Sequence, residues 1–122
     1  MPYQNQVPTD IKLHSKSRLL EIAFDDGVSY SLSCEFLRVN SPSAEVRGHG
    51  PGQEVLQLDK ELVNITAIEP VGMYAVKLVF DDGHDSGLYS WEYLYELGEG
   101  QDEKWQDYLQ RLSQAGHQRK AD

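Results

Sequence analysis

The sequence has a single cysteine, Cys34, among its 122 residues. One thiol cannot form an internal disulfide, and it excludes every metal site that needs several cysteines from this chain. No apolar stretch reaches 18 residues, which argues against a membrane-spanning helix. The first residues have neither a basic region nor an apolar run, so the sequence predicts no secretion signal. We therefore expect a cytoplasmic protein.

Positively charged residues are few, with 11 Lys and Arg against 20 Asp and Glu and a formal net charge of −9. Proteins that bind nucleic acids cluster Lys and Arg to displace counterions, whereas the basic residues here are scattered along the chain. The composition therefore disfavours nucleic acid and membrane surfaces as partners. A basic protein partner stays open, and so does the simpler explanation that the charge keeps the domain soluble.

Common enzyme motifs are also missing. Ser86 lies near His84 but has no Gly-x-Ser-x-Gly surrounding, and the glycine-rich residues 48–52 lack the Lys-Ser/Thr of a phosphate-binding loop. Adjacent carboxylates at 25–26 and 81–82 are explained by the preference of turns for Asp. We predict that this chain alone is not an enzyme.

Alternating apolar and polar residues dominate what is present, and this pattern is typical of half-buried strands. Residues 20–24 and 28–32 alternate on either side of Asp25-Asp26-Gly27, which predicts a hairpin because glycine accepts a positive φ. Ser33 is expected to cap a short helix after the hairpin. The same alternation predicts further strands at residues 9–14, 55–58, 63–68 and 74–80.

The remaining chain predicts a C-terminal helix through about residue 115, with Asp102 as its cap. An apolar stripe recurs at helical spacing and either packs on its own domain or docks a partner. The stripe consists of Trp105, Tyr108, Leu109 and Leu112. We expect a flexible leader at 1–10, one domain at 11–115, a long loop at 39–53 and a frayed tail at 116–122.

An internal echo connects the two halves of the chain. Residues 22–27 and 78–83 both read as an apolar strand ending in Phe-Asp-Asp-Gly, and residues 32–37 match 88–94 if one residue is inserted in the later copy. Strand, turn, short strand and short helix therefore occur twice. We predict an α+β fold, rich in antiparallel strands, in which two pseudo-repeated strand-turn-strand-helix units pack together and a helix follows at the C-terminus.

Two segments suggest a family. Leu37-Arg38-Val39-Asn40 and the later Asp82-Gly83-His84-Asp85-Ser86-Gly87 resemble the N-terminal domain of gamma-butyrobetaine hydroxylase. The chain is still more similar to small bacterial proteins that consist of little besides this domain and have no assigned function. The resemblance covers about residues 11–97.

The resemblance also implies a zinc site that this chain does not reproduce. In the hydroxylases the domain holds a structural zinc through three cysteines and one histidine. By position His84 would be the histidine ligand, but the cysteine positions fall near Ser41, Ser43 and Val46. These side chains cannot replace thiolates in a tetrahedral zinc site, so we expect no zinc of this type and no cofactor.

The function that the resemblance implies is not catalytic. In the hydroxylases this domain precedes a separate iron- and 2-oxoglutarate-dependent catalytic domain, which we do not expect here. A similar domain also occurs fused to P-loop ATPases that handle iron-sulfur clusters, an analogy that hints at an adaptor or cluster-related role. The first hypothesis is a protein-interaction or adaptor domain with an unknown protein partner. The alternative is a metal-handling protein that carries zinc or iron through His84.

Four residues form the candidate recognition surface, because Arg and aromatic side chains are favoured at the centres of protein interfaces. These residues are Arg38, His84, Tyr89 and Trp91. The alternative is that Tyr89 and Trp91 belong to the core.

For a metal, weak candidates to join His84 are Cys34, His49 and Asp85, at a spacing that matches no known ligand pattern. The competing interpretation is that Cys34 is a small buried hydrophobic residue and that His84 only stabilises its turn by hydrogen bonding.

Overall fold

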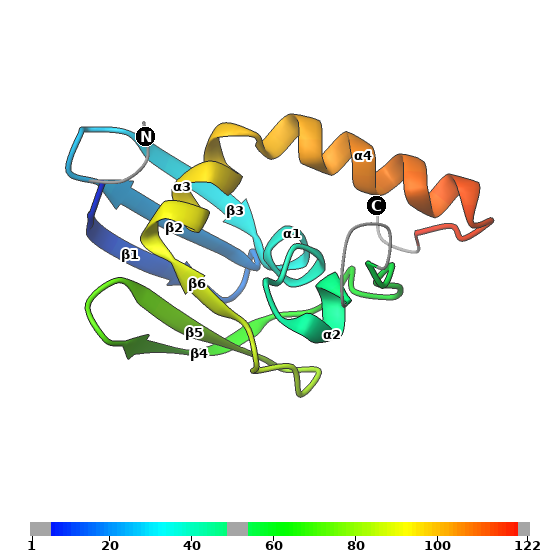
Figure 1. The fold of residues 1–122 in the computed structure, drawn as a ribbon, viewed down its shortest axis with the longest axis horizontal. Helices are drawn as coiled ribbons and strands as arrows, with labels where there is room; N and C mark the ends of the chain where they lie inside the picture. The colour runs from blue at the N-terminus through cyan, green and yellow to red at the C-terminus, as the bar shows by residue number, and fades with distance from the viewer. Residues whose placement is uncertain (1–5, 49–53, 120–122) are drawn as a thin grey trace.

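A computed structural model of the chain describes residues 6–48 and 54–119. Figure 1 shows two sheets on one side of the molecule and a long helix, α4, that runs from them toward the opposite side. Among the described residues the order of elements is β1 (Pro8–His14), β2 (Leu19–Phe24), β3 (Ser29–Ser33), α1 (Cys34–Val39), α2 (Ala44–Arg47), β4 (Ile65–Val71), β5 (Ala75–Phe80), β6 (Leu88–Ser90), α3 (Trp91–Glu99) and α4 (Gln101–Gln114).

The six strands of the described chain form two sheets of three, in the orders β1-β2-β3 and β4-β5-β6, and every pairing is antiparallel. The hairpin predicted around Asp25-Asp26-Gly27 is present, with Ala23 opposite Ser29 and Leu20 opposite Leu32. The predicted α+β class and the C-terminal helix are confirmed.

The predicted repetition is real and extends further than the sequence indicates. Each sheet is a meander of three strands followed by a short helix, so that β1, β2, β3 and α1 correspond to β4, β5, β6 and α3. Even the irregularities correspond, because the first strand of each sheet shifts register near its start, between Pro8 and Asp10 in one and between Ile65 and Ala67 in the other. The internal echo therefore includes the first strand of each unit.

The two Asp-Asp-Gly turns use the same hydrogen bonds. Gly27 and Gly83 have φ values of 88° and 91°, a region that glycine enters without steric cost. In the first turn Asp26 Oδ1 accepts from the backbone N–H of Val28 at 3.0 Å, and in the second Asp82 Oδ1 accepts from that of His84 at 3.1 Å. His84 is therefore the counterpart of Val28, one residue beyond the turn glycine.

The helices of both units start in the same way. Ser33 Oγ accepts from the backbone N–H of Phe36 at 3.0 Å, and Ser90 Oγ accepts from that of Tyr93 at 3.0 Å. A serine oxygen here satisfies one of the backbone donors that a helix leaves free in its first turn. The helix cap predicted at Ser33 is confirmed.

Each helix then reaches the turn of the other unit. Arg38 of α1 donates from Nε to Asp82 Oδ2 at 2.9 Å, and Tyr95 of α3 donates from its hydroxyl to Asp26 Oδ2 at 2.6 Å. These reciprocal contacts are those expected of two units related by a pseudo-two-fold axis.

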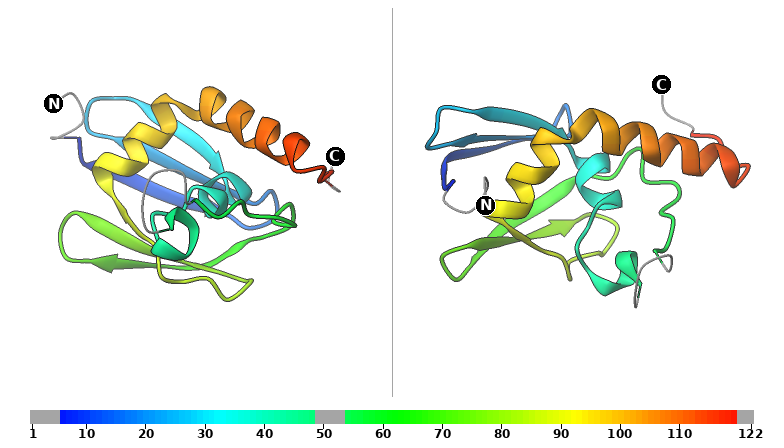
Figure 2. Two further views of the ribbon diagram at one scale, coloured as in Figure 1. Left: turned by 45° about the vertical axis from the view of Figure 1, so that its right-hand side comes forward. Right: turned by 45° about the horizontal axis from the view of Figure 1, so that its top comes forward.

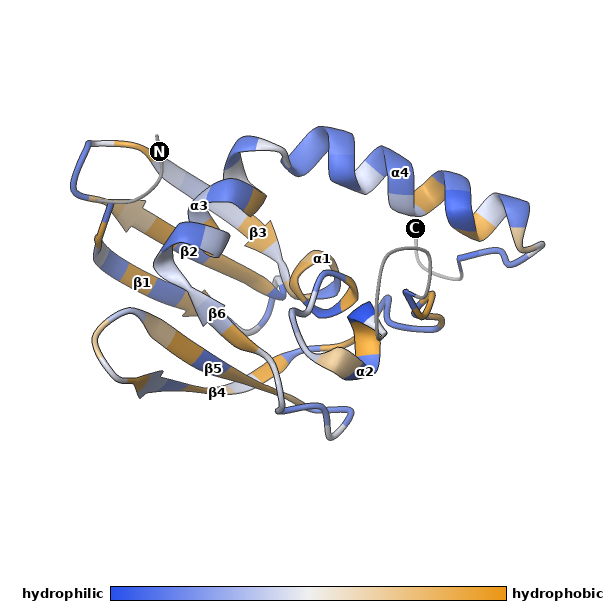
Figure 3. Cartoon of the chain, viewed as in Figure 1, coloured by the Kyte–Doolittle hydropathy of each residue, from blue (hydrophilic) through white to orange (hydrophobic). Residues whose placement is uncertain are grey.

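The core lies where the inner faces of the two units meet. β2 contributes Leu20, Ile22 and Phe24, and β5 contributes Val76, Leu78 and Phe80, so alternate residues of both central strands are buried. Figure 3 shows much of β2 and β5 as hydrophobic and most of α4 as hydrophilic. Burial of this apolar surface is the main force that holds the two units together.

The C-terminal helix covers its own domain. Tyr108 and Leu112 are buried, and the Trp105 ring lies 6.4 Å from that of Phe36 on α1. Figure 2 shows α4 continuing from α3 with only a short bend between them. Of the two alternatives for the apolar stripe, packing on its own domain is the one observed. Among the described residues, every helix is too short or too polar to cross a bilayer.

Some expectations about individual elements are wrong. Residues 55–58 form no strand; they run instead beside α4, where Tyr108 donates its hydroxyl proton to the Gln57 carbonyl at 2.7 Å. Asp102 does not cap α4, because the helix begins at Gln101 directly after the end of α3 and its N-cap is Gly100. The short helix α2 lies inside the region 39–53 that the sequence predicts as a loop, of which residues 49–53 lie outside the described chain.

The chain ends also differ from the expected leader and tail. Pro8 to Asp10 belong to β1 rather than to a leader. In the expected tail, Arg119 donates from Nε to the buried carboxylate of Glu35 at 2.9 Å, and its guanidinium stacks 5.2 Å from the Trp105 ring centroid. The described part of the tail is therefore packed against α1 and α4.

Candidate functional site

His84 lies at the centre of a hydrogen-bonded cluster between the β5–β6 turn and the segment that connects α1 to α2. Its side chain is buried, with Nε2 2.8 Å from Ser41 Oγ and Nδ1 3.1 Å from Glu45 Oε1. Ser41 Oγ also accepts from the backbone N–H of Ser43 at 3.2 Å. This pattern fits a neutral ring that donates from Nδ1 to Glu45 and accepts at Nε2 from the Ser41 hydroxyl.

A second serine pair extends the cluster. Ser43 and Ser86 have their hydroxyl oxygens 2.8 Å apart, and Ser86 donates to Glu45 Oε1 at 2.9 Å. Ser43 also caps α2 by accepting from the backbone N–H of Glu45 at 3.2 Å. The positions at which the resemblance places cysteines, Ser41, Ser43 and Val46, are thus brought to the neighbourhood of His84 or its cluster, with hydroxyl groups and a valine in place of thiolates.

Burial and the nearby Arg38 charge lower the pKa of His84, and they outweigh Glu45 and Asp82, which raise it. The lowered pKa favours the neutral ring at neutral pH, in agreement with the hydrogen-bond pattern. Partial burial alone would raise the pKa of Asp82, but hydrogen bonds from Lys60, the His84 backbone and Arg38 outweigh it and lower the value to about 2.

Arg38 is part of the same assembly but faces inward. Its side chain is 9% exposed, and it donates from Nε to Asp82 and from Nη1 to Gln57 Oε1 at 3.0 Å. Lys60 also donates to Asp82, at 2.6 Å. Through these two hydrogen bonds Arg38 connects α1, the 54–64 segment and the second turn.

The structure does not bring the four expected recognition residues to one surface. Tyr89 is 0% exposed and donates its hydroxyl proton to the Leu37 carbonyl at 2.6 Å, so it is a core residue here. His84 and Arg38 are buried as described. Trp91 is half-buried, and its indole N–H donates to the Met73 carbonyl at 2.9 Å. Of the four, Trp91 is the residue that borders an accessible surface.

The metal candidates lie apart. Cys34 is buried, its Sγ lies 3.6 Å from Asn64 Oδ1, and burial raises the pKa of its thiol, which disfavours the thiolate that binds metals. Among the described residues, Cys34, His84 and Asp85 do not form a group close enough to share an ion. His49 lies outside the described residues.

A cavity of about 580 Å³ lies between α2, the 54–57 segment and α4. It is lined in part by Arg47, Tyr93, Tyr108 and Arg111. Both tyrosine hydroxyls are already bonded to backbone carbonyls of Asn40 and Gln57, and Arg47 stacks 4.9 Å from the Tyr93 ring centroid. These aromatic and basic groups therefore serve mainly to pack the region around residues 39–57.

The β4–β5 hairpin and β6 carry exposed apolar side chains that are not among the residues predicted for a site. We call this group the hairpin patch: Val71, Met73, Tyr74 and Leu88, whose exposed fractions are 40%, 79%, 74% and 50%. Val71 of β4 pairs with Ala75 of β5, and Leu88 of β6 pairs with Lys77 of β5. Ala75 and Lys77 are two residues apart, so Val71 and Leu88 point to the same outer face of the sheet. In the sequence, the two consecutive apolar residues Met73 and Tyr74 interrupt the alternation of apolar and polar residues, and this break could have indicated an exposed apolar group.

The duplicated unit and the serine-histidine cluster define a small α+β domain in which the conspicuous histidine acts as a hydrogen-bonding residue. The chain belongs to the family described as gamma-butyrobetaine hydroxylase-like, N-terminal, whose model matches residues 11–95. This match confirms the family suggested by the sequence. No curated protein sequence matches the chain.

Solved structures agree with this assignment. One protein, whose structure was determined by NMR in solution, is 58% identical over 95% of this chain and 86% of its own, with a TM-score of 0.82. A second NMR structure is 51% identical over 96% of this chain and 92% of its own, with a TM-score of 0.81. A crystal structure of a DUF971-family protein of unknown function from Acidithiobacillus ferrooxidans is 37% identical over 75% of this chain and 91% of its own, with a TM-score of 0.63.

Proposed function

We propose that this domain is a non-catalytic protein-interaction module and that the hairpin patch is its contact surface. The observation that carries the proposal is the exposure of the adjacent Met73 and Tyr74, 79% and 74%, in the turn between β4 and β5, with Leu88 of β6 half exposed on the outer face of the same sheet. Single exposed apolar residues are normal on protein surfaces, but a contiguous apolar patch marks a surface that becomes covered. Tyrosine and methionine are also enriched at the centres of protein interfaces.

The hairpin that carries the patch is firmly attached to the domain. Trp91, the first residue of α3, donates from its backbone N–H to the Tyr74 carbonyl at 2.8 Å and from its indole to the Met73 carbonyl. Both bonds use backbone carbonyls and leave the side chains of Met73 and Tyr74 at the surface. A rigid support of this kind reduces the entropy that binding would cost.

The charge around the patch indicates the chemistry of the partner. Glu92, Glu96 and Arg47 line a shallow hollow together with Leu88, so acidic residues predominate there, and the whole chain carries a formal net charge of −9. We expect a protein partner that presents apolar side chains flanked by Lys or Arg. Complementary charge of this kind speeds association and weakens with salt.

Paired substitutions test the surface. The variant Met73→Ser/Tyr74→Ser removes the most exposed part of the patch, and Leu62→Ser removes an equally exposed leucine, 69% accessible, outside the patch. All three substituted residues are exposed, so both variants should fold. Quantitative affinity purification from the native cell should recover the same partner with the wild type and Leu62→Ser, and lose it with the patch variant and at high salt.

Equal recovery of the partner by the patch variant would contradict the proposal. Mapping the recovered partner onto the domain by NMR supplies a second readout, in which the largest amide shift changes should fall at 71–74 and 88. If they fall instead around 39–57, the interaction surface is the cavity region and not the hairpin patch.

The geometry around His84 supports this module over metal handling through His84. Both ring nitrogens already face partners at hydrogen-bonding distance, so an ion would have to displace either Ser41 or Glu45. Elemental analysis of protein purified without chelators tests the alternative. Stoichiometric zinc or iron that disappears in His84→Ala would favour metal handling through this residue.

A further inference from the structure

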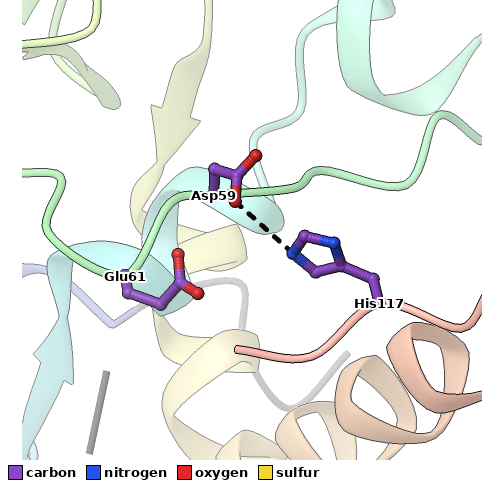
Figure 4. Close-up of side chains that lie close together, drawn as sticks. All are labelled: Asp59, Glu61 and His117. Atoms are coloured by element: carbon purple, nitrogen blue, oxygen red, sulfur yellow. Dashed lines mark ion pairs between the residues drawn. The ribbon is translucent and has the colours of Figure 1, made fainter. Parts of the chain in front are cut away.

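Three side chains capable of binding a metal meet at a place that shares no residue with the serine-histidine cluster. Asp59 and Glu61 come from the segment before β4, and His117 comes from the tail after α4 (Figure 4). One ligand atom of each residue lies within 4.8 Å of the others, and the three side chains point toward one another. Asp59 is exposed and the other two are half-buried.

His117 is held in place by the way α4 ends. Gly116 has a φ of 75° and donates its backbone N–H to the Ser113 carbonyl at 3.0 Å, while His117 donates its own to the Leu112 carbonyl at 2.9 Å. These two bonds form a Schellman motif, which reverses the chain directly after a helix. The reversal directs the imidazole back toward residues 59–61.

The acidic pair is held by contacts on either side of it. Lys60, between the two acids, extends away to bind Asp82, and Arg18 donates from Nε to the Leu62 carbonyl at 3.1 Å. Asp59 adopts a φ of 61°, which turns the chain at this point. The segment is thus fixed to both units of the fold, with Asp59 and Glu61 directed toward the tail.

The imidazole itself points to a ligand. Nε2 of His117 is buried from solvent and has no hydrogen-bond partner among the described residues, although it lies 3.5 Å from Asp59 Oδ1. Burial of a polar nitrogen without a partner costs free energy, so such an atom calls for an explanation such as a bound ion. Two ligands of a tetrahedral zinc ion are about 3.4 Å apart, which is close to this separation.

We propose that Asp59, Glu61 and His117 bind one divalent transition-metal ion. An imidazole with two carboxylates is a ligand set suited to Zn²⁺, with water completing the coordination, whereas Mg²⁺ and Ca²⁺ prefer oxygen ligands alone. The ion would offset the two negative charges of the carboxylates.

The site would tie the tail to the segment before β4, next to the packing of Arg119 on Trp105. It uses no residue of the serine-histidine cluster and none of the hairpin patch, so it stands or falls independently of the proposed interaction function. A ligand that binds the folded chain through two separate segments also raises its stability.

Titration calorimetry with Zn²⁺ on the full chain, without a polyhistidine tag and after chelator treatment, tests the proposal. We expect one site in the wild type that is weakened about 10-fold to 100-fold or more in His117→Gln and in Asp59→Asn, since loss even of an outer-shell partner costs this much. The matched control is His14→Gln, because His14 also pairs with a carboxylate, Glu21 at 3.0 Å, and has no third ligand in the described chain.

Absence of Zn²⁺ binding by the wild type, or equal binding by His117→Gln, would overturn the proposal. Mg²⁺ that competes with Zn²⁺ as well as Zn²⁺ itself would also overturn the proposal, because a general acidic surface, and not a site with an imidazole ligand, would give that result. Glu61→Gln changes the third proposed ligand in a surface segment. An unchanged amide NMR spectrum of each apo variant shows that the variant is folded, so that weaker binding reports loss of a ligand and not loss of folding. A melting temperature that rises with Zn²⁺ in the wild type and not in His117→Gln is the second expected result.

Discussion

The imidazole Nε2 of His84 lies 2.8 Å from the hydroxyl oxygen of Ser41, and this contact connects the turn after β5 to the segment after α1. The family resemblance predicts a zinc ligand at both positions. In this chain a buried hydroxyl takes the place of one thiolate, and Glu45 binds the other ring nitrogen. Hydrogen bonds therefore make the connection between the two halves that the resemblance assigns to a metal.

Replacement of His84 should destabilise the fold. His84→Ala leaves the buried Ser41 hydroxyl without its partner and creates a cavity, so we expect a loss of about 2 kcal/mol in the free energy of unfolding. Urea denaturation measures this loss. His14→Ala is the control, because His14 is an exposed residue on β1, and its expected effect is within about 0.5 kcal/mol. Equal effects of both variants would show that the cluster contributes no special stability.

Asp82 should make stability fall in acid. Its pKa is about 2 in the folded chain against an ordinary 3.8, so the folded state favours the charged form. The resulting stability is present above pH 3.8 and is lost as the pH falls from 3.8 through about 2. Because the side chain keeps some contact with water, we expect about 1–2 kcal/mol.

Urea unfolding at several pH values across this range checks the prediction. Asp82→Asn should lose stability at neutral pH and show a correspondingly smaller further loss in acid. Asp85→Asn, at an exposed position after the same turn, should keep the wild-type pH dependence. An acid dependence that is the same in Asp82→Asn and the wild type would contradict the role given to the Arg38, Lys60 and His84 contacts.

Two neighbouring glycines offer a matched pair. A Cβ at Gly98, inside α3, would overlap the ring of Tyr30, whereas a Cβ at Gly100 would meet only ordinary contacts, the nearest being Lys104 Cε at 3.5 Å. Gly98→Ala should therefore destabilise by about 1–3 kcal/mol, despite the better helix propensity of alanine. Gly100→Ala should have little effect or stabilise slightly. Thermal unfolding followed by circular dichroism distinguishes the two, and equal behaviour would contradict the close packing of α3 on β3.

The Glu35–Arg119 pair predicts that the tail contributes to stability. Glu35 is 7% exposed, so Arg119→Ala leaves a buried carboxylate without its main partner. We expect a loss of about 3 kcal/mol, at the lower end of the range for buried pairs because Arg119 is partly accessible. The double variant Glu35→Gln/Arg119→Ala should recover part of this loss. An Arg119→Ala variant as stable as the wild type would mean that the tail is not held.

Local chemistry explains the parts of the fold that the sequence predicts well. The Asp25-Asp26-Gly27 hairpin and the Ser33 cap depend on neighbouring residues, and the structure contains both. The internal repeat was also visible, because the same turn and cap chemistry recurs at Asp82-Gly83 and Ser90. A residue whose hydrogen bonds go to residues nearby in the chain can be recognised from the sequence.

Contacts between distant segments carried no such signal. The alternation at 55–58 resembles a strand, but this segment pairs with no described strand. Val55 donates its backbone N–H to the Val46 carbonyl of α2, and the Gln57 carbonyl accepts from Tyr108 of α4. Arg119 looked like part of a frayed tail because its partner Glu35 is 84 residues away. Gly116 is an exception, since a glycine directly after a helix is a known signal for a reversal that would have placed His117 near the domain.

The candidate site was only partly predictable. His84 and the serines at the cysteine positions were identified from the family resemblance, but the partners Glu45 and Ser86 depend on the packing of α2 against the second turn. Tyr89 could not be assigned to core or surface from its neighbours, because aromatic residues serve both roles. The hairpin patch was missed because Tyr74 continues the alternation of the predicted strand 74–80, whereas the structure places Met73 and Tyr74 in the turn before β5.

Long-range ¹H–¹⁵N NMR of the His84 imidazole is the most direct test of the hydrogen-bonded cluster. We expect a neutral ring with the proton on Nδ1, an Nε2 that accepts from Ser41, and a pKa below the ordinary value of 6.5. A ring protonated on Nε2, a pKa above 6.5, or an Nε2 shift typical of a metal-bound nitrogen would contradict this expectation.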